Sequence, residues 1–561
     1  MPDNERQFEQ DIESFLISPV GGWQKASDAG YRASMDSGMA LDLATLVGFV
    51  QATQPIQWQR FEKQCNSDPE KKFYKAFENA VENDGLISVL RHGFKHRGIE
   101  FRVCYFKPES TLNDVAVKHY GQNICQCIRQ WHYSGQNNNS VDMMLAVNGI
   151  PVVAIELKNQ LTGQSVDNAK RQWMFDRDPK EPAFRLNHRV LVFFAVDLYE
   201  AVMTTKLDGA KTYFLPFNQG SNGPGRDGGA GNPPSPDGDY VTSYLWKDVL
   251  RKDNFLDIIQ KFVNLQVKKE KAPQKDGAQR EITKKSVIFP RYHQMDVVRR
   301  LIQDVRTNGP GKNYLVQHSA GSGKSNSIAW TAYRLARLHD DDNKPIFNSV
   351  VIVTDRTVLD AQLQETISGF DHTLGSVVTI DKKKSAKDLR DALNDGKRII
   401  VTTLQKFPVI YEQIDDTSGK AFAVIVDEAH SSQTGQSAMK LKIALADTHD
   451  ALKEYAELEG KAEDELEDAE DKLVREMVSH GKHKNLSFFA FTATPKNKTL
   501  EMFGDEYADG SFHPFHIYSM RQAIEEHFIL DVLENYTTYK TCFQIAKNTP
   551  DNPEVPTIKA I

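Results

Sequence analysis

Asn313-Tyr-Leu-Val-Gln-His-Ser-Ala-Gly-Ser-Gly-Lys-Ser325 is the stretch of this 561-residue chain that decides the fold. Its apolar run at 314–316 is typical of a short buried strand, and the small residues after it predict a tight loop. Residues 325–336 then have the spacing of a helix. A strand, a glycine loop and a helix in this order form the framework that cradles phosphates, so the sequence predicts an α/β domain with a nucleotide site at this loop.

The residue types in the loop suit a triphosphate. Gly321 and Gly323 let the backbone approach the phosphates closely, and the first turn of the helix offers N–H groups and the positive end of its dipole. Lys324 supplies positive charge, and Ser325 can bind Mg²⁺. His318 stands where the pattern G-x-x-x-x-G-K-[ST] begins with glycine, so a solvated Gly/Ser turn stays open as the alternative. We expect the nucleotide to contact the loop at His318, Gly321, Ser322, Gly323, Lys324 and Ser325.

Later segments repeat the alternation of strand and helix. Strands are expected at four apolar runs that end in polar residues, namely Ser349–Thr354, Arg398–Thr403, Ala421–Val426 and Leu486–Phe491. The carboxyl ends of parallel strands meet at one edge of a sheet, where α/β proteins bind their ligands. The polar strand ends are therefore expected to lie beside the phosphate-binding loop.

Two of these strand ends carry chemistry. Val424-Ile-Val-Asp-Glu-Ala-His430 predicts Asp427 in the Mg²⁺ shell and Glu428 as the base for the attacking water. Phe491-Thr-Ala-Thr-Pro495 ends the next strand and resembles the helicase motif that couples nucleotide state to DNA. Gln294, upstream of the loop, resembles the adenine-recognition residue of superfamily 2 helicases. The ordered set predicts an ATP-dependent nucleic-acid translocase core.

A second candidate site precedes the motor region. The segment Ser140–Lys158 contains two apolar strands around Asn148-Gly149, a pair that is typical of a hairpin turn. Asp142, Glu156 and Lys158 carry charge on these strands, which is costly unless something pairs it. The three side chains are therefore candidates for a metal site, with Asp142 and Glu156 as ligands. A surface ion pair at the strand ends is the alternative.

The turn decides whether the two carboxylates converge. A two-residue turn at 148–149 would put Asp142 and Glu156 on opposite faces of the hairpin. A type I turn with Gly149 as a left-handed bulge would oppose Asp142 to Ala154 and bring Glu156 onto the same face. Because a metal site needs both carboxylates on one face, the chemistry predicts the bulged turn.

Two carboxylates on Mg²⁺ with a lysine beside them suit phosphodiester hydrolysis. The metal would polarise the phosphate, and Lys158 could position the attacking water or stabilise the pentacovalent charge. The pattern resembles the PD-(D/E)-x-K nuclease superfamily, with Val141 at the position of the motif's proline. Gln172 lies where the RecB-like branch carries a glutamine, but Asp176 replaces the aromatic residue usual four positions later.

The composition is that of an ordinary globular protein, with 40% hydrophobic and 26% charged residues. Neither a run of about 18 apolar residues nor a signal-like N-terminus occurs, so we expect a cytoplasmic protein with no membrane partner. The net charge is −7, but residues 446–476 alone hold 13 acidic and 4 basic residues. The remainder is close to neutral, so charge neither supports nor excludes DNA. Five irregularly spaced cysteines favour free thiols over a disulfide framework or a zinc site.

Shifts in composition divide the chain. The expected parts are an endonuclease domain at 1–265, a linker at 266–285, a first RecA-like domain at 286–513 with an acidic helical insertion at about 436–485, and the start of a second RecA-like domain at 514–561. The first helix places its apolar residues on one face between Phe8 and Leu16. Glu9 and Glu13 lie one turn apart beside that face, where we expect them to be solvated.

A metal-dependent nuclease pattern ahead of a superfamily 2 motor resembles the restriction (R, HsdR) subunit of type I restriction-modification enzymes. Pro216-Phe-Asn-Gln-Gly220, Asp355-Arg356 and the segment Tyr518–Asp531 also take part in the resemblance. It implies a PD-(D/E)-x-K nuclease-like domain followed by a RecA-like motor with a parallel sheet, and ATP and Mg²⁺ as cofactors. The implied partners are double-stranded DNA, a modification methyltransferase subunit and a DNA-specificity subunit. Such a subunit would pull unmodified DNA past the complex and cut it away from the recognition site.

The chain ends at Ile561, before the expected second motor domain supplies its arginine to the nucleotide. We therefore expect an N-terminal fragment of a longer subunit, with weak ATP binding and slow hydrolysis. The alternative is a DNA-repair or defence helicase whose nuclease-like domain only binds DNA, and a non-enzymatic scaffold is third. The target DNA sequence cannot be read from this chain, because base readout would belong to another subunit.

Overall fold

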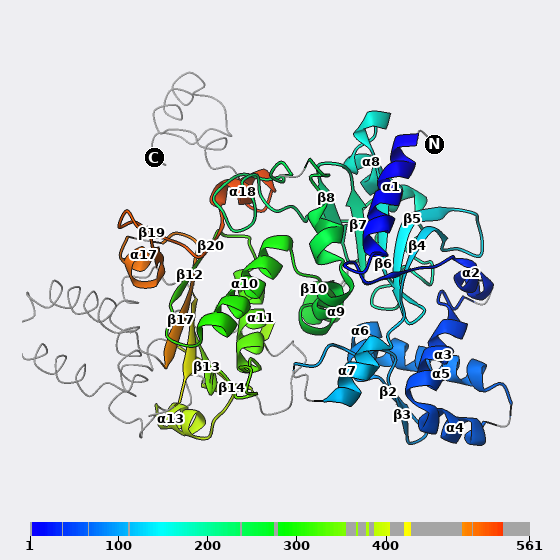
Figure 1. Cartoon of the computed structure of the whole chain (residues 1–561), viewed down its shortest axis with the longest axis horizontal. Coiled ribbons are helices and arrows are strands. Elements are labelled where there is room, and N and C mark those ends of the chain that lie inside the picture. The colour runs from blue at the N-terminus through cyan, green and yellow to red at the C-terminus, as the bar shows by residue number, and fades with distance from the viewer. Residues whose placement is uncertain are drawn as a thin grey trace, which may run out of the picture.

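Two seven-stranded sheets, joined by a middle section of loops, a helix and a hairpin, make up the computed structural model (Figure 1). The structure describes residues 3–530 except 36–37, 66, 110–112, 236–237, 274–278, 355–365, 368–376, 381–385, 404–419, 428–484 and 496. The expected acidic insertion, Glu428 and the pair Asp355-Arg356 lie outside the described residues. Within the described part, no helix is long and apolar enough to cross a membrane.

The N-terminal helices bury the apolar stripes that the sequence indicates. The helix expected around Phe8–Leu16 is α1 (Asp3–Leu16), and its residues Phe8, Ile12 and Leu16 are buried. The elements that follow are α2 (Ala29–Met35), α3 (Leu43–Thr53), α4 (Pro55–Gln64), α5 (Pro69–Asp84), α6 (Leu86–His92), the hairpin strands β2 (Phe94–His96) and β3 (Ile99–Phe101), and α7 (Asp114–Gly121). They gather below the first sheet in the view of Figure 1.

The first sheet is mixed, in the order β1-β4-β5-β6-β7-β8-β9. Its strands are β1 (Gln24–Lys25), β4 (Cys125–His132), β5 (Ser140–Val147), β6 (Ile150–Leu157), β7 (Val192–Val196), β8 (Ala201–Thr204) and β9 (Leu215–Pro216). Strands β4, β5 and β6 are antiparallel neighbours. Strand β7 runs parallel to β6 after a crossover through α8 (Val166–Arg171) and a π-helical turn at Gln172–Asp176. All of β6 is buried, and α8 contacts β6 and β7 while α1 lies in front of the sheet in Figure 1.

A loop rich in Gly, Pro and Asn follows β9, and its residues 217–235 reach residues 517–525. The backbone N–H of Ile517 donates to the Gly225 carbonyl at 2.9 Å, and the Ser519 hydroxyl donates to the Gly228 carbonyl at 2.5 Å. The Ala230 N–H donates to a carboxylate oxygen of Glu525 at 2.7 Å. The loop therefore connects the N-terminal half to residues about 290 positions later in the chain.

Helix α9 (Lys252–Lys261) and a hairpin join the two halves. The hairpin strands are β10 (Asn264–Pro273) and β11 (Gln279–Ile288), in the segment where the sequence predicts a linker. Helix α9 ends at Lys261, and the chain enters β10 at Asn264. After β11 it enters α10 (Tyr292–Asn308).

The second sheet is parallel throughout, in the order β14-β15-β13-β16-β17-β12-β20. Its strands are β12 (Tyr314–His318), β13 (Ser349–Thr354), β14 (Val377–Ile380), β15 (Ile399–Thr403), β16 (Phe422–Asp427), β17 (Leu486–Thr492) and β20 (His516–Tyr518). The helices are α11 (Lys324–Ala336), α13 (Ala386–Asn394), α17 (Asn497–Phe503) and α18 (Met520–Glu525), and β18 (Asp505–Glu506) pairs with β19 (Phe512–His513). The four strands predicted at 349–354, 398–403, 421–426 and 486–491 form within one residue of their expected bounds, and the strand predicted at 314–316 extends two residues further.

One boundary prediction is wrong. Residues 514–561 were expected to begin a second RecA-like domain, but β20 pairs with β12 at the edge of the second sheet. His516 and Tyr518 are fully buried there, so this short strand has enough apolar and aromatic contact to join the sheet edge. The second sheet therefore continues past the boundary expected at 513.

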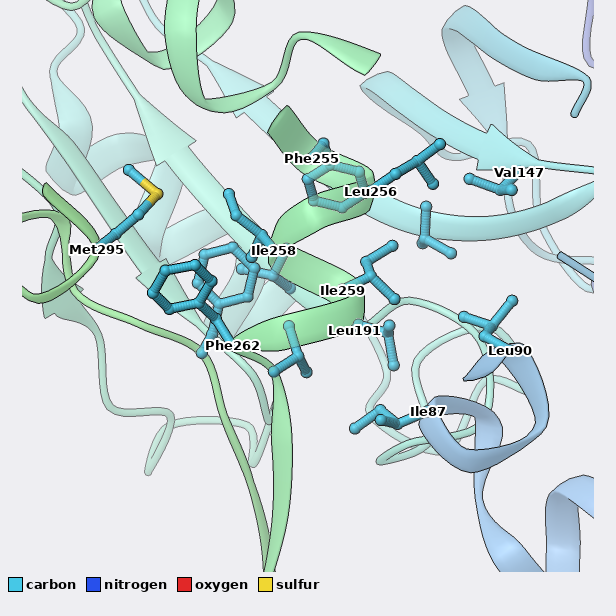
Figure 2. Close-up of a cluster of buried hydrophobic side chains, with 14 of the residues drawn as sticks. Ile87, Leu90, Val147, Leu191, Phe255, Leu256, Ile258, Ile259, Phe262 and Met295 are labelled. Carbon is cyan, nitrogen blue, oxygen red and sulfur yellow. The ribbon is translucent and has the colours of Figure 1, made fainter. Parts of the chain in front are cut away.

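The core is continuous between the two halves because α9 lies at their junction. Figure 2 shows Leu256 and Ile259 of α9 directed toward Val147 and Leu90 of the N-terminal half, while Ile258 lies toward Met295 of α10. At the end of α9, the Trp330 indole of α11 donates to the Phe262 carbonyl at 2.9 Å. Ion pairs reinforce this contact, including Arg334 with Asp257 at 3.0 Å. The two halves therefore share a buried apolar interface rather than a solvated linker.

Candidate functional site

The hairpin of β5 and β6 brings the two predicted metal ligands onto one face, but not by the predicted turn. Asn148 and Gly149 have φ angles of 51° and 81°, and Val147 pairs with Ile150, so the turn has two residues. The predicted three-residue turn with a Gly149 bulge is wrong. A side chain at Gly149 would also collide with the Asp42 carbonyl at 2.3 Å.

A bulge inside β6 restores the register that the turn would lose. Ala146 pairs with Pro151 while Leu145 pairs with Val153, which leaves one extra residue in β6. Proline has no N–H to donate to a ladder, so a bulge beside it costs the sheet little. Beyond the bulge, Met143 pairs with Ile155. Continuing this register places Asp142 opposite Glu156.

The three predicted nuclease residues are buried together. The exposed fractions of Asp142, Glu156 and Lys158 are 5%, 0% and 8%. Asp142 Oδ2 accepts the Leu157 N–H at 2.8 Å and lies 3.8 Å from Lys158 Nζ. The alternative of a surface ion pair is wrong for this cluster, because none of its members is at the surface.

Arg177 pairs with the buried Glu156 and was not found by sequence reasoning. Its Nε and Nη2 donate to Glu156 Oε1 at 2.9 and 2.7 Å, and Nη2 also donates to the Ser140 carbonyl at 2.7 Å. Glu156 Oε2 is buried, and no hydrogen bond to it is found among the described residues. Burial and the charge of Asp142 raise the pKa of Glu156, against the lowering effects of Arg177 and Lys158.

Helix α1 supplies three more carboxylates beside this cluster. Glu9 and Glu13, expected to be solvated, are 1% and 4% exposed, and that expectation is wrong. Glu9 accepts hydrogen bonds from Arg129 and from Gln130, and Gln130 also donates to Asp142 Oδ1 at 3.3 Å. Burial and the charge of Asp142 raise the pKa of Glu9.

Glu5, the third of these carboxylates, accepts a hydrogen bond from Lys158 Nζ at 3.4 Å. A sequence signal for this group exists, because Glu5, Glu9 and Glu13 recur every four residues beside the apolar stripe of α1. Sequence reasoning could not tell which element faces this helix. The contacts to β4 and to Lys158 answer that question.

Gln172 lies on the π-helical turn after α8 and is half-buried. The turn delivers Trp173 into the core, where its indole donates to the Phe194 carbonyl at 2.9 Å. The turn ends directly before Arg177, and it places the Arg177 guanidinium beside Glu156. A direct role for Gln172 stays a prediction.

The phosphate-binding loop has the predicted strand, loop and helix around it. Gly321 and Gly323 have φ angles of 74° and 75°, which side chains rarely adopt. Lys324 and Ser325 open α11, so their N–H groups lie at the positive end of the helix dipole. Lys324 Nζ donates to the His318 carbonyl at 3.3 Å, which folds the lysine back over its own loop.

Gln294 supports the loop in this structure. Its Nε2 donates to the carbonyls of Ser322 and Gly323 at 2.9 and 3.2 Å, and its Oε1 accepts the Arg291 N–H at 2.9 Å. Both amide hydrogens are therefore used by the loop. Adenine recognition by Gln294 stays a prediction, and it would require the side chain to leave these carbonyls.

Arg291 ties the loop to the segment after β20 and was not found by sequence reasoning. Its Nη1 donates to the Gly321 carbonyl at 2.9 Å, and its Nη2 donates to the Tyr518 hydroxyl and to Glu526 at 2.5 and 2.9 Å. The guanidinium lies 3.5 Å from the centre of the Phe528 ring. The loop is therefore fixed by residues that come about 200 positions later.

His318 does not face the loop opening. Its ring is fully buried, and Nε2 lies 2.9 Å from His516 Nδ1. His516 in turn contacts Asp296 at 3.0 Å. Burial, and then the neighbouring His516 and Lys324, lower the pKa of His318 well below its usual value. The ring therefore belongs to a buried network, and the contact of His318 with the nucleotide that the sequence predicts would come from its backbone.

The remaining residues predicted for the nucleotide site lie at the carboxyl edge of the second sheet. Asp427 ends β16 and Thr492 ends β17, and β17 lies between β16 and β12. The strand ends of Asp427 and of the phosphate-binding loop are thus two strand spacings apart, roughly 10 Å. The exposed fraction of Asp427 is 8%. Glu428 lies outside the described residues, so its role as base stays a prediction.

A further cluster has the composition of a metal site but already contains its own cations. Ligand atoms of Glu78, Glu82 and His188 lie within 4.8 Å of one another. Arg189 pairs with Glu78 at 2.7 Å, and Arg185 pairs with Glu82. Burial alone would raise the pKa of Glu78, but the hydrogen bond from His188 and the charge of Arg189 lower it to about 2. This cluster is a structural ion-pair network that joins α5 to the segment before β7.

Two family models match successive parts of the chain. The model for the type I restriction enzyme R protein N terminus matches residues 23–212. The model for the SWI2/SNF2 ATPase matches residues 293–552. The first match covers the cluster of Asp142, Glu156 and Lys158, and the second covers the phosphate-binding loop.

The curated relatives are distant. The endonuclease subunit of the HindI type I restriction enzyme from Haemophilus influenzae is 24% identical over 378 residues, covering 63% of this chain and 32% of the relative. A putative type I restriction enzyme MjaVIIIP endonuclease subunit from Methanocaldococcus jannaschii is 23% identical over 353 residues, covering 58% of this chain and 30% of the relative. The chain thus spans about a third of the length of these relatives.

Solved structures align only loosely. A fragment of a putative HsdR subunit of a type I restriction enzyme from Vibrio vulnificus aligns at 15% identity and a TM-score of 0.27, over 73% of this chain and 57% of that one. The SWI2/SNF2 ATPase core of Sulfolobus solfataricus, solved with double-stranded DNA, aligns at 15% identity and a TM-score of 0.24, over 38% and 35% of the two chains. These overlaps add nothing to the family matches.

Proposed function

We propose, because this chain belongs to the family of restriction subunits of type I restriction enzymes, that it joins a Mg²⁺-dependent endonuclease to an ATP-driven translocase of double-stranded DNA. Its helicase-type ATPase domain implies nucleotide use. In this proposal the chain works in the cytoplasm with a modification methyltransferase subunit and a DNA-specificity subunit. It cuts unmodified duplex DNA away from the recognition site.

The observation that carries the nuclease half is the buried cluster of Asp142, Glu156 and Lys158. Glu156 Oε2 has no hydrogen-bond partner among the described residues, although it is buried next to the charge of Asp142. An unsatisfied carboxylate oxygen beside a second carboxylate fits a divalent cation, which would neutralise the excess negative charge. Asp142 and Glu156 are therefore the residues that would hold Mg²⁺.

Neighbouring groups in the cluster prepare these ligands. When bound, Mg²⁺ would polarise a phosphate and lower the pKa of a water molecule. The Leu157 N–H and Gln130 fix the two oxygens of Asp142. Arg177 fixes Glu156 by its Oε1 and leaves Oε2 for the cation. Lys158 Nζ, 3.8 Å from Asp142, would orient the attacking water or stabilise charge on the phosphate.

The motor half rests on the phosphate-binding loop and the strand ends beside it. Lys324 and the first N–H groups of α11 would hold the phosphates, and Ser325 with Asp427 would hold the nucleotide's Mg²⁺. Glu428 would then serve as the base for water. The ordered motifs and the ATPase family match support this assignment.

A second candidate is a DNA-repair or defence helicase whose N-terminal domain only binds DNA. The ion pairs of the cluster favour it, since Arg177 already neutralises Glu156 and Lys158 already contacts Glu5. A carboxylate that a guanidinium neutralises can remain buried without a metal. The two candidates differ in whether the cluster cuts DNA.

Cleavage of supercoiled plasmid by the chain separates these candidates. With Mg²⁺ we expect nicked and linear products, and EDTA should abolish them. Asp142→Ala and Lys158→Ala should each lower the rate about 100-fold or more, because each removes charge that stabilises the transition state. Lys324→Ala should leave cutting by this chain unchanged, because the nucleotide loop lies on the other sheet.

Asp176→Ala is a matched control, because it removes an exposed carboxylate one residue before Arg177. Its cutting rate should equal that of the unaltered chain. Plasmid that is bound but not cut, in the unaltered chain and in every variant, would favour the helicase with a DNA-binding N-terminal domain.

A further inference from the structure

The hairpin of β10 and β11 stands apart from both sheets. Its strands pair with each other over ten residue pairs, from Asn264 opposite Ile288 to Pro273 opposite Gln279. Among the described strands, β10 and β11 pair with no other strand and form a two-stranded sheet. In the chain, the ribbon lies between α9 and α10.

Most side chains near the base of the ribbon are exposed on both faces. The described residues 267–269 and 282–286 are all exposed, including Val267 at 52% and Ile282 at 41%. An isolated two-stranded hairpin is only marginally stable in water. At the described residues 267–269 and 282–286, beyond a base where Val287 is buried, the ribbon therefore lacks the packing that stabilises other sheets, and a partner would supply it.

The charge of the ribbon specifies the class of partner. The two strands contain six basic and two acidic residues. Lys268 lies directly opposite Lys284 on one face, and such like-charge pairs destabilise an antiparallel pair. On the other face, Lys269 and Lys285 are diagonal neighbours. Both faces of the ribbon thus carry lysines at neighbouring positions, and such a surface is suited to binding a polyanion.

We infer that the β10–β11 ribbon is a binding surface for the phosphate backbone of duplex DNA. Ten residues per strand give a ribbon roughly 33 Å long, and the major groove of B-DNA admits a two-stranded ribbon. The ribbon would hold DNA at the junction of the motor and the nuclease-like half. The inference rests on the proposed function, in which the chain acts on duplex DNA.

The test measures DNA affinity of the full 561-residue chain against salt concentration. Four substitutions, Lys268→Gln, Lys269→Gln, Lys284→Gln and Lys285→Gln, are combined in one ribbon variant, and anisotropy of a labelled duplex is followed. Each phosphate contact contributes about 0.9 to the slope of log K against log salt. We expect the slope to become shallower by about 2 to 4, and the same positions changed to arginine should keep the original slope.

A matched control removes the same charge elsewhere. Lys71→Gln, Lys72→Gln, Lys75→Gln and Lys118→Gln are combined, since all four lysines are exposed on α5 and α7. This variant should keep the original slope, and thermal unfolding should show that both variants are folded. An equal slope in the ribbon variant and the unaltered chain would overturn the inference.

Other outcomes are separable. A slope change seen with single-stranded but not duplex DNA would overturn the duplex as partner. If the ribbon instead neutralises the acidic residues 446–476 of this chain, the substitutions would lower the unfolding midpoint and leave the slope unchanged, which also overturns the inference. No duplex binding by the unaltered chain would contradict the proposed function itself.

Discussion

Two buried arginines, Arg177 and Arg291, support the two candidate sites in different ways. Each pairs with a buried glutamate, Glu156 or Glu526, and each also donates to a backbone carbonyl. Arg177 pairs with a residue that is itself a predicted metal ligand. Arg291 pairs with a glutamate that is not a predicted ligand, and it donates to the Gly321 carbonyl within the phosphate-binding loop.

The difference lies in which group each arginine neutralises. At the nuclease cluster the guanidinium uses one oxygen of Glu156, so protein and metal would share one carboxylate. At the nucleotide loop the guanidinium binds the backbone and leaves Lys324 and Ser325 for the phosphates. At the first site the same residue, Glu156, contributes to folding stability and would bind the metal. At the second site Arg291 and Glu526 contribute to stability, and other residues would bind the nucleotide.

Arg177→Met gives the largest expected effect. It leaves Glu156 buried without its cation, and breaking a buried ion pair on one side costs about 3–5 kcal/mol. Denaturant unfolding of the variant and of the unaltered chain measures the difference. Arg177→Lys should recover part of the loss, because a lysine restores charge but not the two hydrogen bonds.

The double variant Arg177→Met with Glu156→Met checks the cause. It removes both charges, so it should recover at least half of the stability that Arg177→Met loses. If Arg177→Met costs less than about 1 kcal/mol, a bound proton or another cation neutralises Glu156, and the contrast with Arg291 is wrong.

The placement of the predicted nucleotide-site residues could be predicted from sequence because a parallel sheet collects its strand ends at one edge. Once Tyr314–Val316, the strand before Asp427 and the strand before Thr492 are recognised, topology brings their ends together whatever the side chains do. The hydrogen bonds from residues distant in the sequence could not be predicted. Arg291 is an example, because its partners depend on how β20 pairs at the edge of the sheet.

The nuclease cluster was harder because an antiparallel hairpin depends on register. A shift of one residue moves a side chain to the other face, and the sequence allowed two turns. The chain uses the two-residue turn and then inserts a bulge beside Pro151, so the correct face was predicted for a wrong reason. Glu9 was also misjudged, since the spacing within α1 does not reveal that β4 covers it.

Arg291→Met should have the next largest effect, and it should act on nucleotide binding. Loss of the hydrogen bond to the Gly321 carbonyl frees the loop, and Glu526 keeps a buried charge with fewer partners. We expect a loss of stability of about 2–3 kcal/mol and nucleotide affinity about 10-fold weaker. Titration with a fluorescent ATP analogue and denaturant unfolding measure the two quantities.

Arg291→Lys and Lys324→Ala separate the roles of charge and loop support. Arg291→Lys should recover affinity only in part, because lysine cannot bridge Gly321 and Glu526 with a planar fork. Lys324→Ala should weaken affinity at least as much as Arg291→Met with a smaller loss of stability. If Arg291→Met lowers stability but leaves nucleotide affinity unchanged, Arg291 supports the fold alone.

Acidic pH should change the stability contributed by Glu156 and by His318 in opposite directions. We expect this effect to be smaller than those of Arg177→Met and Arg291→Met. Burial raises the pKa of Glu156, so protonation relieves an unfavourable charge there. Burial also lowers the pKa of His318 well below 6.5, so the unfolded chain takes up a proton before the folded chain does. Below about pH 6.5 this difference favours unfolding by up to about 1.4 kcal/mol per pH unit for one histidine.

The contribution of His318 is thus complete above pH 6.5 and is lost as the pH falls toward its lowered pKa. The rings of His516, His293 and Tyr518 face its ring, and the charges of His516, Lys324 and Arg291 disfavour a further positive charge on it. We therefore expect the free energy of unfolding to fall between pH 7 and pH 5 in both proteins. The fall should be about 1–2 kcal/mol smaller in His318→Asn than in the unaltered chain. His527→Asn changes an exposed histidine at positive φ and should keep the original pH dependence. Equal pH dependence in His318→Asn and the unaltered chain would mean that the buried network accepts the proton without cost.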